Sequence, residues 1–321
     1  MKVSTVLIGL ILMVCSFANV LFAQPNAIFN KDTIENFSTG KVNWTQGRIL
    51  ASGIGVPNPN LPLAASRATA RRAATLVARR NLLELTNGIR VDSETTVQNF
   101  LVKSDRIQTK ISGLIKGATV ENIEEYAHGG IEITLSMPLW GNDSLGLALL
   151  EESDTPNTAF HQSEEGAEYT GVIIDARRLG LKPAIFPKIL EEDGQIIYGR
   201  KTPSRHALEI QGFVQYETIP PLQKTLMHWW YSDQIEVFRI ENSTSAVSRV
   251  GRRPIRIKGL RIQGTLKTNV IISKEDAEKI KQTPSLLKAL QKANLVIITD
   301  PLIAGIQGNS KKGFIYRAST F

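Results

Sequence analysis

An alanine-rich segment, residues 60–85, constrains the fold of this chain more than any other feature. It contains no glycine, and its single proline, Pro62, lies at the start, where a helix tolerates it. We therefore expect a helix that is capped near Asn60 and stops at Asn87-Gly88. Because alanine side chains let a neighbouring backbone approach closely, this helix should lie flat on a sheet.

The expected apolar face of this helix is imperfect. At 100° per residue, Arg80 shares a face with the four residues Thr69, Ala73, Leu76 and Leu83. Arg80 then either extends outward along its aliphatic stem or is paired inside.

A second helix is indicated by apolar residues at helical spacing, with Ser104 as the nearest N-cap: Ile107, Ile111, Leu114, Ile115 and Ala118. Residues 48–56, 119–127 and 131–137 have the pattern of strands, and residues 128–130 predict a hairpin between the last two. A short strand is also expected at 89–95. This order predicts an α+β domain with two helices on one face of a small, mainly antiparallel sheet.

Residues 141–168 lose this periodicity and gather acidic side chains, which is typical of a linker between domains. We expect a first domain at 24–140, an acidic, protease-sensitive linker at 141–168, and a second, strand-rich α+β domain at 169–321. The expected strands of the second domain are 169–176, 185–190, 195–198, 207–216, 235–240, 255–260, 268–272 and 295–299. Ser273 begins a capping box for one short helix, and Thr283-Pro284 begins another.

The N-terminus has the layout of a cleaved secretion signal at residues 1–23. Lys2 precedes an apolar run, and Ala23 supplies a small residue at the cleavage position. Two alternatives remain open: an uncleaved anchor, because the run approaches the roughly 20 residues that span a bilayer, and lipidation of Cys15, although Val14 stands where a small residue is expected. Cleavage would leave no cysteine, so neither a disulfide nor a thiolate would be available.

The charges are segregated along the chain, whose net charge is +8. Residues 117–176 hold twelve Asp or Glu and no Lys or Arg, whereas residues 242–274 hold eight Lys or Arg and no acid. A separate group of five arginines lies in the alanine-rich segment: Arg67, Arg71, Arg72, Arg79 and Arg80.

The basic run contains Arg252, Arg253, Arg256 and Lys258, with Ile255 and Ile257 at alternate positions. The alternation predicts a half-buried strand with a basic solvent face. An excess of cations without acids also favours an anionic partner. Export and the lack of interleaved aromatic residues argue against nucleic acid. Anionic lipid or polymer, an envelope protein, or the acidic tract of another copy are the partners we expect.

Recognisable catalytic chemistry is absent from the sequence. There is no G-x-S-x-G, Walker A or G-x-G-x-x-G motif, and the histidines lack the spacing of a metal site, so no cofactor or metal is expected. An alternative reading is a glycan hydrolase that uses carboxylates among Asp175, Glu191, Glu192 and Asp193. The aromatic pair Trp229-Trp230 is a candidate interface element.

Several short segments between residues 45 and 140 resemble known envelope proteins. They are Asn81-Leu82-Leu83, Gly88-Ile89-Arg90-Val91, the run from Ile111 to Ala118, Gly130-Ile131-Glu132-Ile133 and Met137-Pro138-Leu139. This part is similar to the Lpp-twenty family of outer-membrane lipoproteins and to the N-terminal domain of flagellar assembly protein T. The segment from Thr170 to Arg177 and on to Gly199 resembles a companion module of exported bacterial proteins. The resemblance implies an envelope protein without catalytic residues.

Together these features predict a non-enzymatic protein of the periplasm or cell envelope, in possible association with the outer membrane. It would act as an assembly or adaptor component that binds another envelope component through charged surfaces. The sequence-level alternative is the envelope glycan hydrolase described above.

Overall fold

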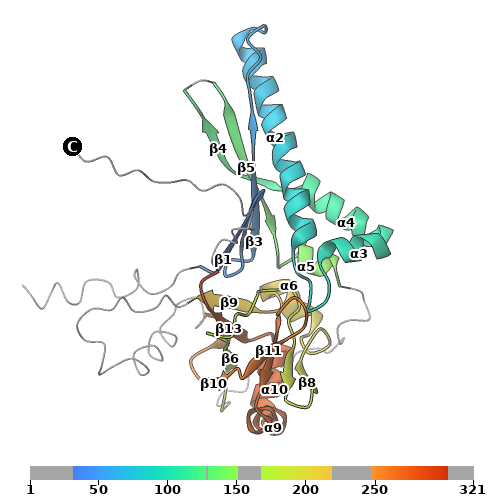
Figure 1. The fold of residues 1–321 in the computed structure, drawn as a ribbon, viewed down its shortest axis with the longest axis vertical. Helices are drawn as coiled ribbons and strands as arrows, with labels where there is room; N and C mark the ends of the chain where they lie inside the picture. Colours follow the sequence, from blue (N-terminus) through green and yellow to red (C-terminus); the bar gives the residue numbers. More distant parts are fainter. Residues whose placement is uncertain (1–31, 128, 151–167, 219–247, 303–321) are drawn as a thin grey trace, which may run out of the picture.

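The computed structural model describes residues 32–127, 129–150, 168–218 and 248–302. The predicted signal at 1–23 therefore lies outside the described residues. The described chain forms a first lobe, residues 32–150, and a second lobe, residues 168–302 (Figure 1). Helices and strands are mixed in both lobes, which confirms the predicted α+β class.

The first lobe is built on a five-stranded antiparallel sheet with the order β1-β2-β3-β5-β4. The strands predicted from alternation are present as β3 (Arg48–Gly55), β4 (Thr119–Glu125) and β5 (Ile131–Pro138). The hairpin of β1 (Ile34–Phe37) and β2 (Gly40–Asn43) was not predicted, because four-residue strands carry too little alternation to be recognised.

Helix α2 (Leu63–Gly88) lies flat on this sheet, as expected, and it ends at the predicted glycine. Gly53 and Gly55 of β3 allow the close approach. A Cβ atom on Gly53 would lie 2.2 Å from the Ala78 nitrogen, and one on Gly55 would lie 1.9 Å from the Ala70 carbonyl oxygen. The cap expected near Asn60 is wrong: Pro62 occupies the N-cap position, where it can offer no side-chain hydrogen bond.

The face of α2 that meets the sheet differs from the predicted one. The buried residues are Ser66, Ala70, Ala74, Ala78, Leu82, Leu85 and Thr86. Leu76 is 65% exposed, Leu83 is 42% exposed, and Arg80 is exposed beside them. The backbone contact with the two glycines selects the small residues for burial, so the larger leucines of the predicted face point to solvent.

Two further helices follow α2. These are α3 (Val97–Lys103) and α4 (Asp105–Lys116), and the Ser104 side chain accepts a hydrogen bond from the Ile107 nitrogen, as the sequence predicted. Both lie on the same side of the sheet as α2 (Figure 1). The predicted strand at 89–95 is wrong, because Arg90 and Thr96 form a single bridge around a turn that the Asp92 carboxylate stabilises.

The second lobe contains two four-stranded sheets. A parallel sheet has the order β10-β6-β13-β9, and a mixed sheet has the order β11-β12-β7-β8. Their strands are β6 (Gly171–Asp175), β7 (Ile189–Glu191), β8 (Ile196–Tyr198), β9 (Gln215–Thr218), β10 (Pro254–Lys258), β11 (Arg261–Gln263), β12 (Asn269–Ile272) and β13 (Leu295–Thr299). The strands predicted at 169–176, 195–198, 255–260, 268–272 and 295–299 are confirmed. The strand predicted at 235–240 lies outside the described residues.

Two predicted strands of this lobe need correction. Residues 207–216 form α6 (Arg205–Gln211) followed by β9, because the Ser204 side chain caps the helix and Gly212, at a φ of 76°, ends it. In residues 185–190, only the last two belong to β7. Ile185 and Phe186 instead donate backbone hydrogen bonds to the carbonyls of Arg90 and Val91 in the first lobe.

The two short helices near the C-terminal end of the described chain are where the sequence placed them. The first, α9 (Lys274–Gln282), is capped by the Ser273 hydroxyl, which accepts from the Asp276 nitrogen at 3.1 Å. The second, α10 (Pro284–Gln291), has proline at its first position. Helix α9 lies at the end of the second lobe that is farthest from the first lobe (Figure 1), whereas the C-terminal end of α10 lies beside α6, where the Ser204 nitrogen donates to the Gln291 carbonyl.

One continuous hydrophobic core joins the lobes. Trp44 contacts Tyr216 edge to face, and Trp140 contacts Phe186 in the same way at 6.0 Å. The first part of the predicted linker is also folded: residues 145–148 form α5 (Leu145–Ala148), and Leu149 and Leu150 are buried after it. The leucines in this segment were too few for their spacing to indicate a helix in the sequence. The rest of the linker, 151–167, lies outside the described residues.

Candidate functional site

The predicted basic run is found on β10, an edge strand of the parallel sheet, and on the turn before it. Ile255 and Ile257 are buried and Lys258 is exposed, which confirms the alternation. Arg256 is half-buried, and it is not without an interaction partner in the structure. The basic face of this strand is therefore less solvated than the sequence suggested.

The partial burial of Arg256 follows from the packing of the parallel sheet. In register, Arg256 lies beside Ile173 of β6. Ile173 belongs to a second buried cluster with Val250, Val296 and Ile298, on the face of the sheet opposite the main core. Parallel sheets are usually buried on both faces, and only the edge position of β10 leaves its charged side chains near solvent.

The structure brings Arg253 together with cations that the sequence did not connect to it. Arg253 lines a cavity of about 730 Å³ with Lys288 and Lys292, which come from the end of α10 and the residue after it. We call this cavity, with the three cations, the basic pocket. Its wall includes Tyr169, Thr170, Ser285 and Asn294, and among the described residues the one carboxylate that lines it belongs to Glu168. Arg252 is exposed at the turn beside it.

Hydrogen bonds around Thr170 hold one wall of the basic pocket in place. The Thr170 nitrogen donates to the Arg253 carbonyl at 2.9 Å, and the Arg253 nitrogen donates to the Thr170 hydroxyl at 2.9 Å. That hydroxyl donates in turn to the Val250 carbonyl, and the Asn294 amide donates to the Thr170 carbonyl. The backbone that carries Arg253 is thus fixed, while its side chain is exposed.

The floor of the basic pocket contains a buried cation, Arg249. Its guanidinium donates to three carbonyl oxygens, those of Ala293, Gln211 and Gly212, at 3.0, 2.6 and 2.9 Å. These carbonyls lie at the C-terminal ends of α6 and α10, where the helix dipoles favour a positive charge. Burial lowers the pKa of Arg249 to about 10, a shift that the nearby Tyr198 opposes, so the guanidinium stays charged at neutral pH.

Sequence reasoning did not separate Arg249 from the other basic residues. Nothing in the local pattern marks it as a residue that joins two helix ends, because both ends are distant in sequence. Its role in the structure is to hold the pocket floor, and the accessible cations of the basic pocket are Arg253, Lys288 and Lys292. Together they can hold a multivalent anion such as a phosphate or a group of carboxylates.

The carboxylates considered for glycan hydrolysis are distributed over two sheets. Asp175 ends β6 and accepts two hydrogen bonds from the Arg177 guanidinium. Glu191 ends β7 and pairs with Lys281 at 2.5 Å. Glu192 and Asp193 lie in the exposed turn after β7.

The environment of Asp175 favours its ionised form. Burial raises the pKa of this carboxyl, but the hydrogen bonds from Arg177 and the charges of Arg177 and Lys258 outweigh burial and hold the pKa below its usual value. Within the described part of the chain, none of the four carboxylates lines the basic pocket or either of two other surface cavities, one near Lys110 and one near Trp140.

Other sequence candidates lie mostly outside the described chain. Trp229 and Trp230 are not among the described residues, and of the four histidines only His206, on α6, is. Over the ranges that are described, no group of three or more His, Cys, Asp or Glu is arranged to hold a metal ion. The described helices also include none with the length and apolar character needed to cross a bilayer.

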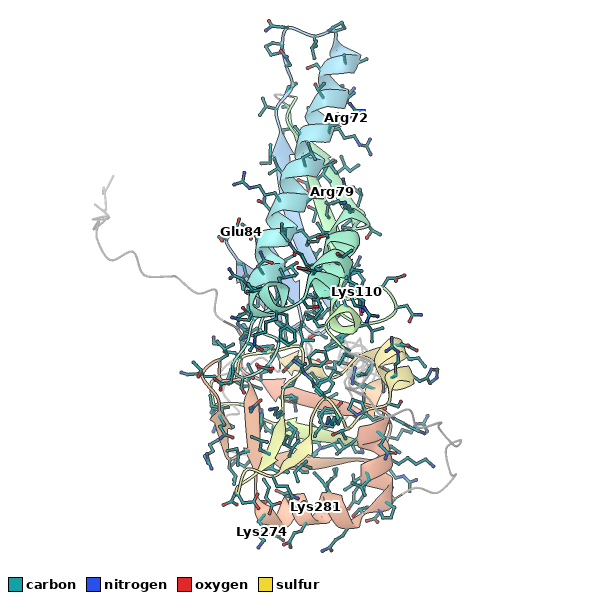
Figure 2. All side chains as sticks on the ribbon, turned by 90° about the vertical axis from the view of Figure 1, so that its right-hand side faces the viewer. Arg72, Arg79, Glu84, Lys110, Lys274 and Lys281 are labelled. Carbon is teal, nitrogen blue, oxygen red and sulfur yellow. The ribbon has the colours of Figure 1, made fainter. Side chains whose placement is uncertain are left out.

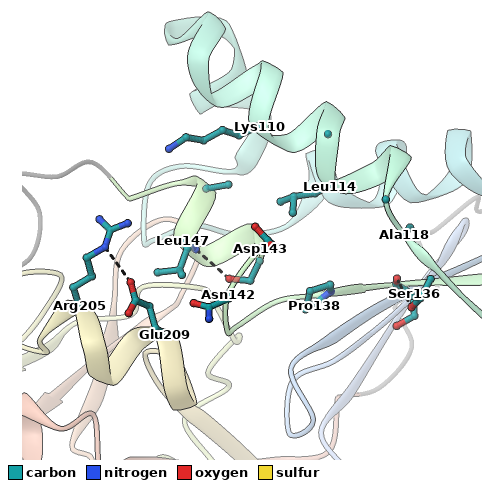
Figure 3. A pocket seen from close by; sticks show the side chains of 15 residues that line it. Lys110, Leu114, Ala118, Ser136, Pro138, Asn142, Asp143, Leu147, Arg205 and Glu209 are labelled. Atoms are coloured by element: carbon teal, nitrogen blue, oxygen red, sulfur yellow. Dashed lines mark hydrogen bonds and ion pairs between the residues drawn. The ribbon is translucent and has the colours of Figure 1, made fainter.

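A larger cleft of about 1030 Å³ lies where α4, α5 and α6 meet (Figure 3). Lys110 of α4 reaches over it from one side, and the Arg205–Glu209 ion pair of α6 borders it on the other, with 3.2 Å between Nε and Oε1. Asp143 supplies a second carboxylate. Positive and negative side chains are balanced here, so the cleft lacks the single sign of charge that distinguishes the basic pocket.

Fold and site together define a two-lobed α+β protein whose second lobe carries a concave basic surface. That lobe is also the part that a known family matches. Residues 171–301 match the family model described as the second domain of Treponema pallidum Tp0624. This range runs from the first residue of β6 to just beyond β13. It contains every residue that lines the basic pocket except Glu168, Tyr169 and Thr170. No curated protein matches the chain.

Proposed function

We propose that this is a non-enzymatic protein of the bacterial cell envelope that binds an anionic envelope component in the basic pocket. The observation that carries the proposal is the convergence of Arg253, Lys288 and Lys292 on one cavity with a fixed backbone. Electrostatic attraction by such a surface gives specificity and speeds association. The occupant is an acidic surface of another envelope protein, an anionic polymer or lipid, or the acidic tract of a second copy.

Two further observations support an envelope location. Residues 1–23 have the layout of a cleaved signal. Residues 45–140 resemble the Lpp-twenty lipoproteins and the N-terminal domain of flagellar assembly protein T, which favours the periplasm or the outer membrane. We infer an assembly or adaptor role from the same resemblance.

The test is a quantitative pull-down from cross-linked envelopes with the double variant Arg253→Glu/Lys292→Glu. Reversal of two accessible charges should abolish capture of the partner while the fold survives, because Arg249 and the hydrogen bonds at Thr170 remain. Lys201→Glu/Arg261→Glu is the matched control, since both residues are exposed and lie away from the pocket. Capture should also weaken as salt rises, because exposed charges are screened over about 8 Å at physiological ionic strength.

A second variant locates the site. Lys258→Glu changes the exposed end of β10 without altering the pocket lining. If Lys258→Glu loses the partner and the pocket variant retains it, the binding surface is the strand and the proposal is wrong. If both variants still capture the partner, the basic residues form only a solvated surface and do not bind it.

A further inference from the structure

The first lobe forms an arm that extends away from the second lobe (Figure 1). It consists of α2, β3 and the β4–β5 hairpin, and the connection between β3 and α2, residues 56–62, lies at its far end. Figure 2 shows Arg72 near this end and Arg79 farther back along the helix. The residues of the far end have no role in the basic pocket.

The far end of the arm exposes large apolar side chains. Val56 is 74% exposed, Leu63 is 75% exposed, and Leu61 is also exposed, at 38%. A soluble surface usually scatters such residues singly, and a group of them marks an interaction site. We call these three residues the arm tip.

The arm tip is held in an ordered loop. The Asn58 side-chain oxygen accepts from the Asn60 nitrogen at 3.0 Å, and the Asn58 carbonyl accepts from the Leu61 nitrogen and from the Ser66 hydroxyl. These bonds fix the loop on the first turn of α2. The apolar side chains are therefore presented outward by a defined backbone and do not fold back onto the arm.

Arginines follow directly behind the arm tip. Between residues 61 and 83 the chain has five arginines, no lysine and no acid. Arg67 pairs with Glu125 of the hairpin, and Arg79 donates to the Lys116 carbonyl. Arg71, Arg72 and Arg80 are exposed, and within the described part of the chain they form no ion pair.

Acidic side chains near the arm tip are on the hairpin. Glu125 is paired with Arg67, and Glu132 accepts a hydrogen bond from the Tyr126 hydroxyl. Glu124 is exposed on the same hairpin. The outward side of α2 therefore carries unpaired positive charge, and the acids are on the strands beside it.

The spacing of these groups matches the layers of a membrane surface. At a rise of 1.5 Å per residue, Arg67 lies about 6 Å behind Leu63, and Arg71 and Arg72 lie about 12 to 14 Å behind it. A bilayer has a headgroup layer of about 5 to 7 Å on each side of its hydrocarbon core. Apolar side chains placed at the acyl boundary would put Arg67 at the level of the phosphates and the backbone of Arg71 and Arg72 about 5 to 9 Å outside the headgroup layer, from where their long side chains can extend back to it.

We propose that the arm tip inserts into the surface of a bilayer that contains anionic phospholipid. Val56, Leu61 and Leu63 enter the boundary between headgroups and acyl chains, and Arg71 and Arg72 bind lipid phosphates. Arginine suits this role because its guanidinium binds a phosphate through two parallel hydrogen bonds. The combination of apolar side chains and basic residues is the one that holds proteins in the membrane interface.

A local probe at the arm tip tests this proposal in the full chain. The chain's single cysteine, Cys15, is changed to serine, and Leu63→Cys is labelled with an environment-sensitive fluorophore. The matched control carries the label at Val102→Cys on α3, which is 85% exposed and lies off the arm tip. Because the readout is local, membrane binding by any other part of the chain does not produce it.

With vesicles of phosphatidylglycerol and phosphatidylcholine, the Leu63 probe should shift to shorter wavelength and the Val102 probe should not. Arg71→Glu/Arg72→Glu should weaken the vesicle affinity by about tenfold or more, since each basic residue near an anionic surface contributes on the order of 1 kcal/mol. Lys201→Glu/Arg261→Glu should leave it unchanged. The proposal is overturned by an unchanged Leu63 probe, by equal shifts at both positions, or by an equal shift on phosphatidylcholine alone.

Discussion

Trp44 of the first lobe packs edge-on against Tyr216 of the second, with 5.7 Å between the ring centroids and an angle of 74° between the planes. Both rings are buried. The Trp44 indole nitrogen also donates to Glu35, whose carboxylate pairs with Arg90, and the Arg90 guanidinium donates to the Pro183 carbonyl of the second lobe. The contact between the lobes is therefore apolar at its centre and hydrogen-bonded beside it.

Truncation of Trp44 should destabilise both lobes at once. Replacement of a buried tryptophan by alanine costs about 3 to 5 kcal/mol of unfolding free energy, and the shared core should make the loss cooperative. We expect Trp44→Ala to lower the midpoint of urea unfolding for the whole protein. Unfolding is monitored by far-UV circular dichroism and by aromatic fluorescence, and the two signals should give the same lowered midpoint. Leu76→Ala, at an exposed position, should change the midpoint little. Separate transitions for the two lobes in the parent protein would contradict a single cooperative core.

The contact between β3 and α2 should not tolerate a methyl group. A Cβ on Gly53 would lie 2.2 Å from the Ala78 nitrogen and 2.5 Å from the Ala74 carbonyl oxygen, so the helix would have to move away from the sheet. We expect Gly53→Ala to reduce the free energy of unfolding by at least about 2 kcal/mol, because overpacking shifts the backbone.

Gly113 is the matched control for this substitution, since a Cβ there meets no atom within 4 Å and the residue lies inside α4. Gly113→Ala should stabilise the protein by about 0.5 to 1 kcal/mol through helix propensity. Chemical denaturation of the two variants beside the parent measures both effects. Equal effects of the two substitutions would show that helix propensity, and not the close contact, governs these positions.

Asp175 should contribute to stability in a pH-dependent way. Its pKa is held below the usual carboxyl value by Arg177 and Lys258 in spite of burial. The contribution is therefore fully present above the pKa of the unfolded chain, about 3.9, and is lost as the pH falls through the lower folded value. Asp175→Asn should be less stable than the parent at pH 6, and the difference should shrink towards pH 2. If the stability difference between Asp175→Asn and the parent stays constant from pH 6 to pH 2, it comes from the changed shape of the side chain and not from the loss of its charge.

Local signals in the sequence determined most of the elements. The run of alanines without glycine makes α2, the spacing of Ile107, Ile111 and Ile115 makes α4, and Ser104 and Ser273 start helices because their hydroxyls accept the unpaired backbone N–H groups. Each of these signals acts over one or two turns of chain. Such signals can be recognised before any tertiary contact is known.

Only the tertiary structure decided which surfaces face each other. Gly53 and Gly55 selected the alanine face of α2 for burial and left Leu76 outside, although helical periodicity alone favoured the larger residue. Arg253 meets Lys288 and Lys292 because parallel pairing of β10, β6 and β13 brings their ends together across some 40 residues of chain. Periodicity records which residues share a side of one element. The partner of that side depends on long-range packing, which no local pattern contains.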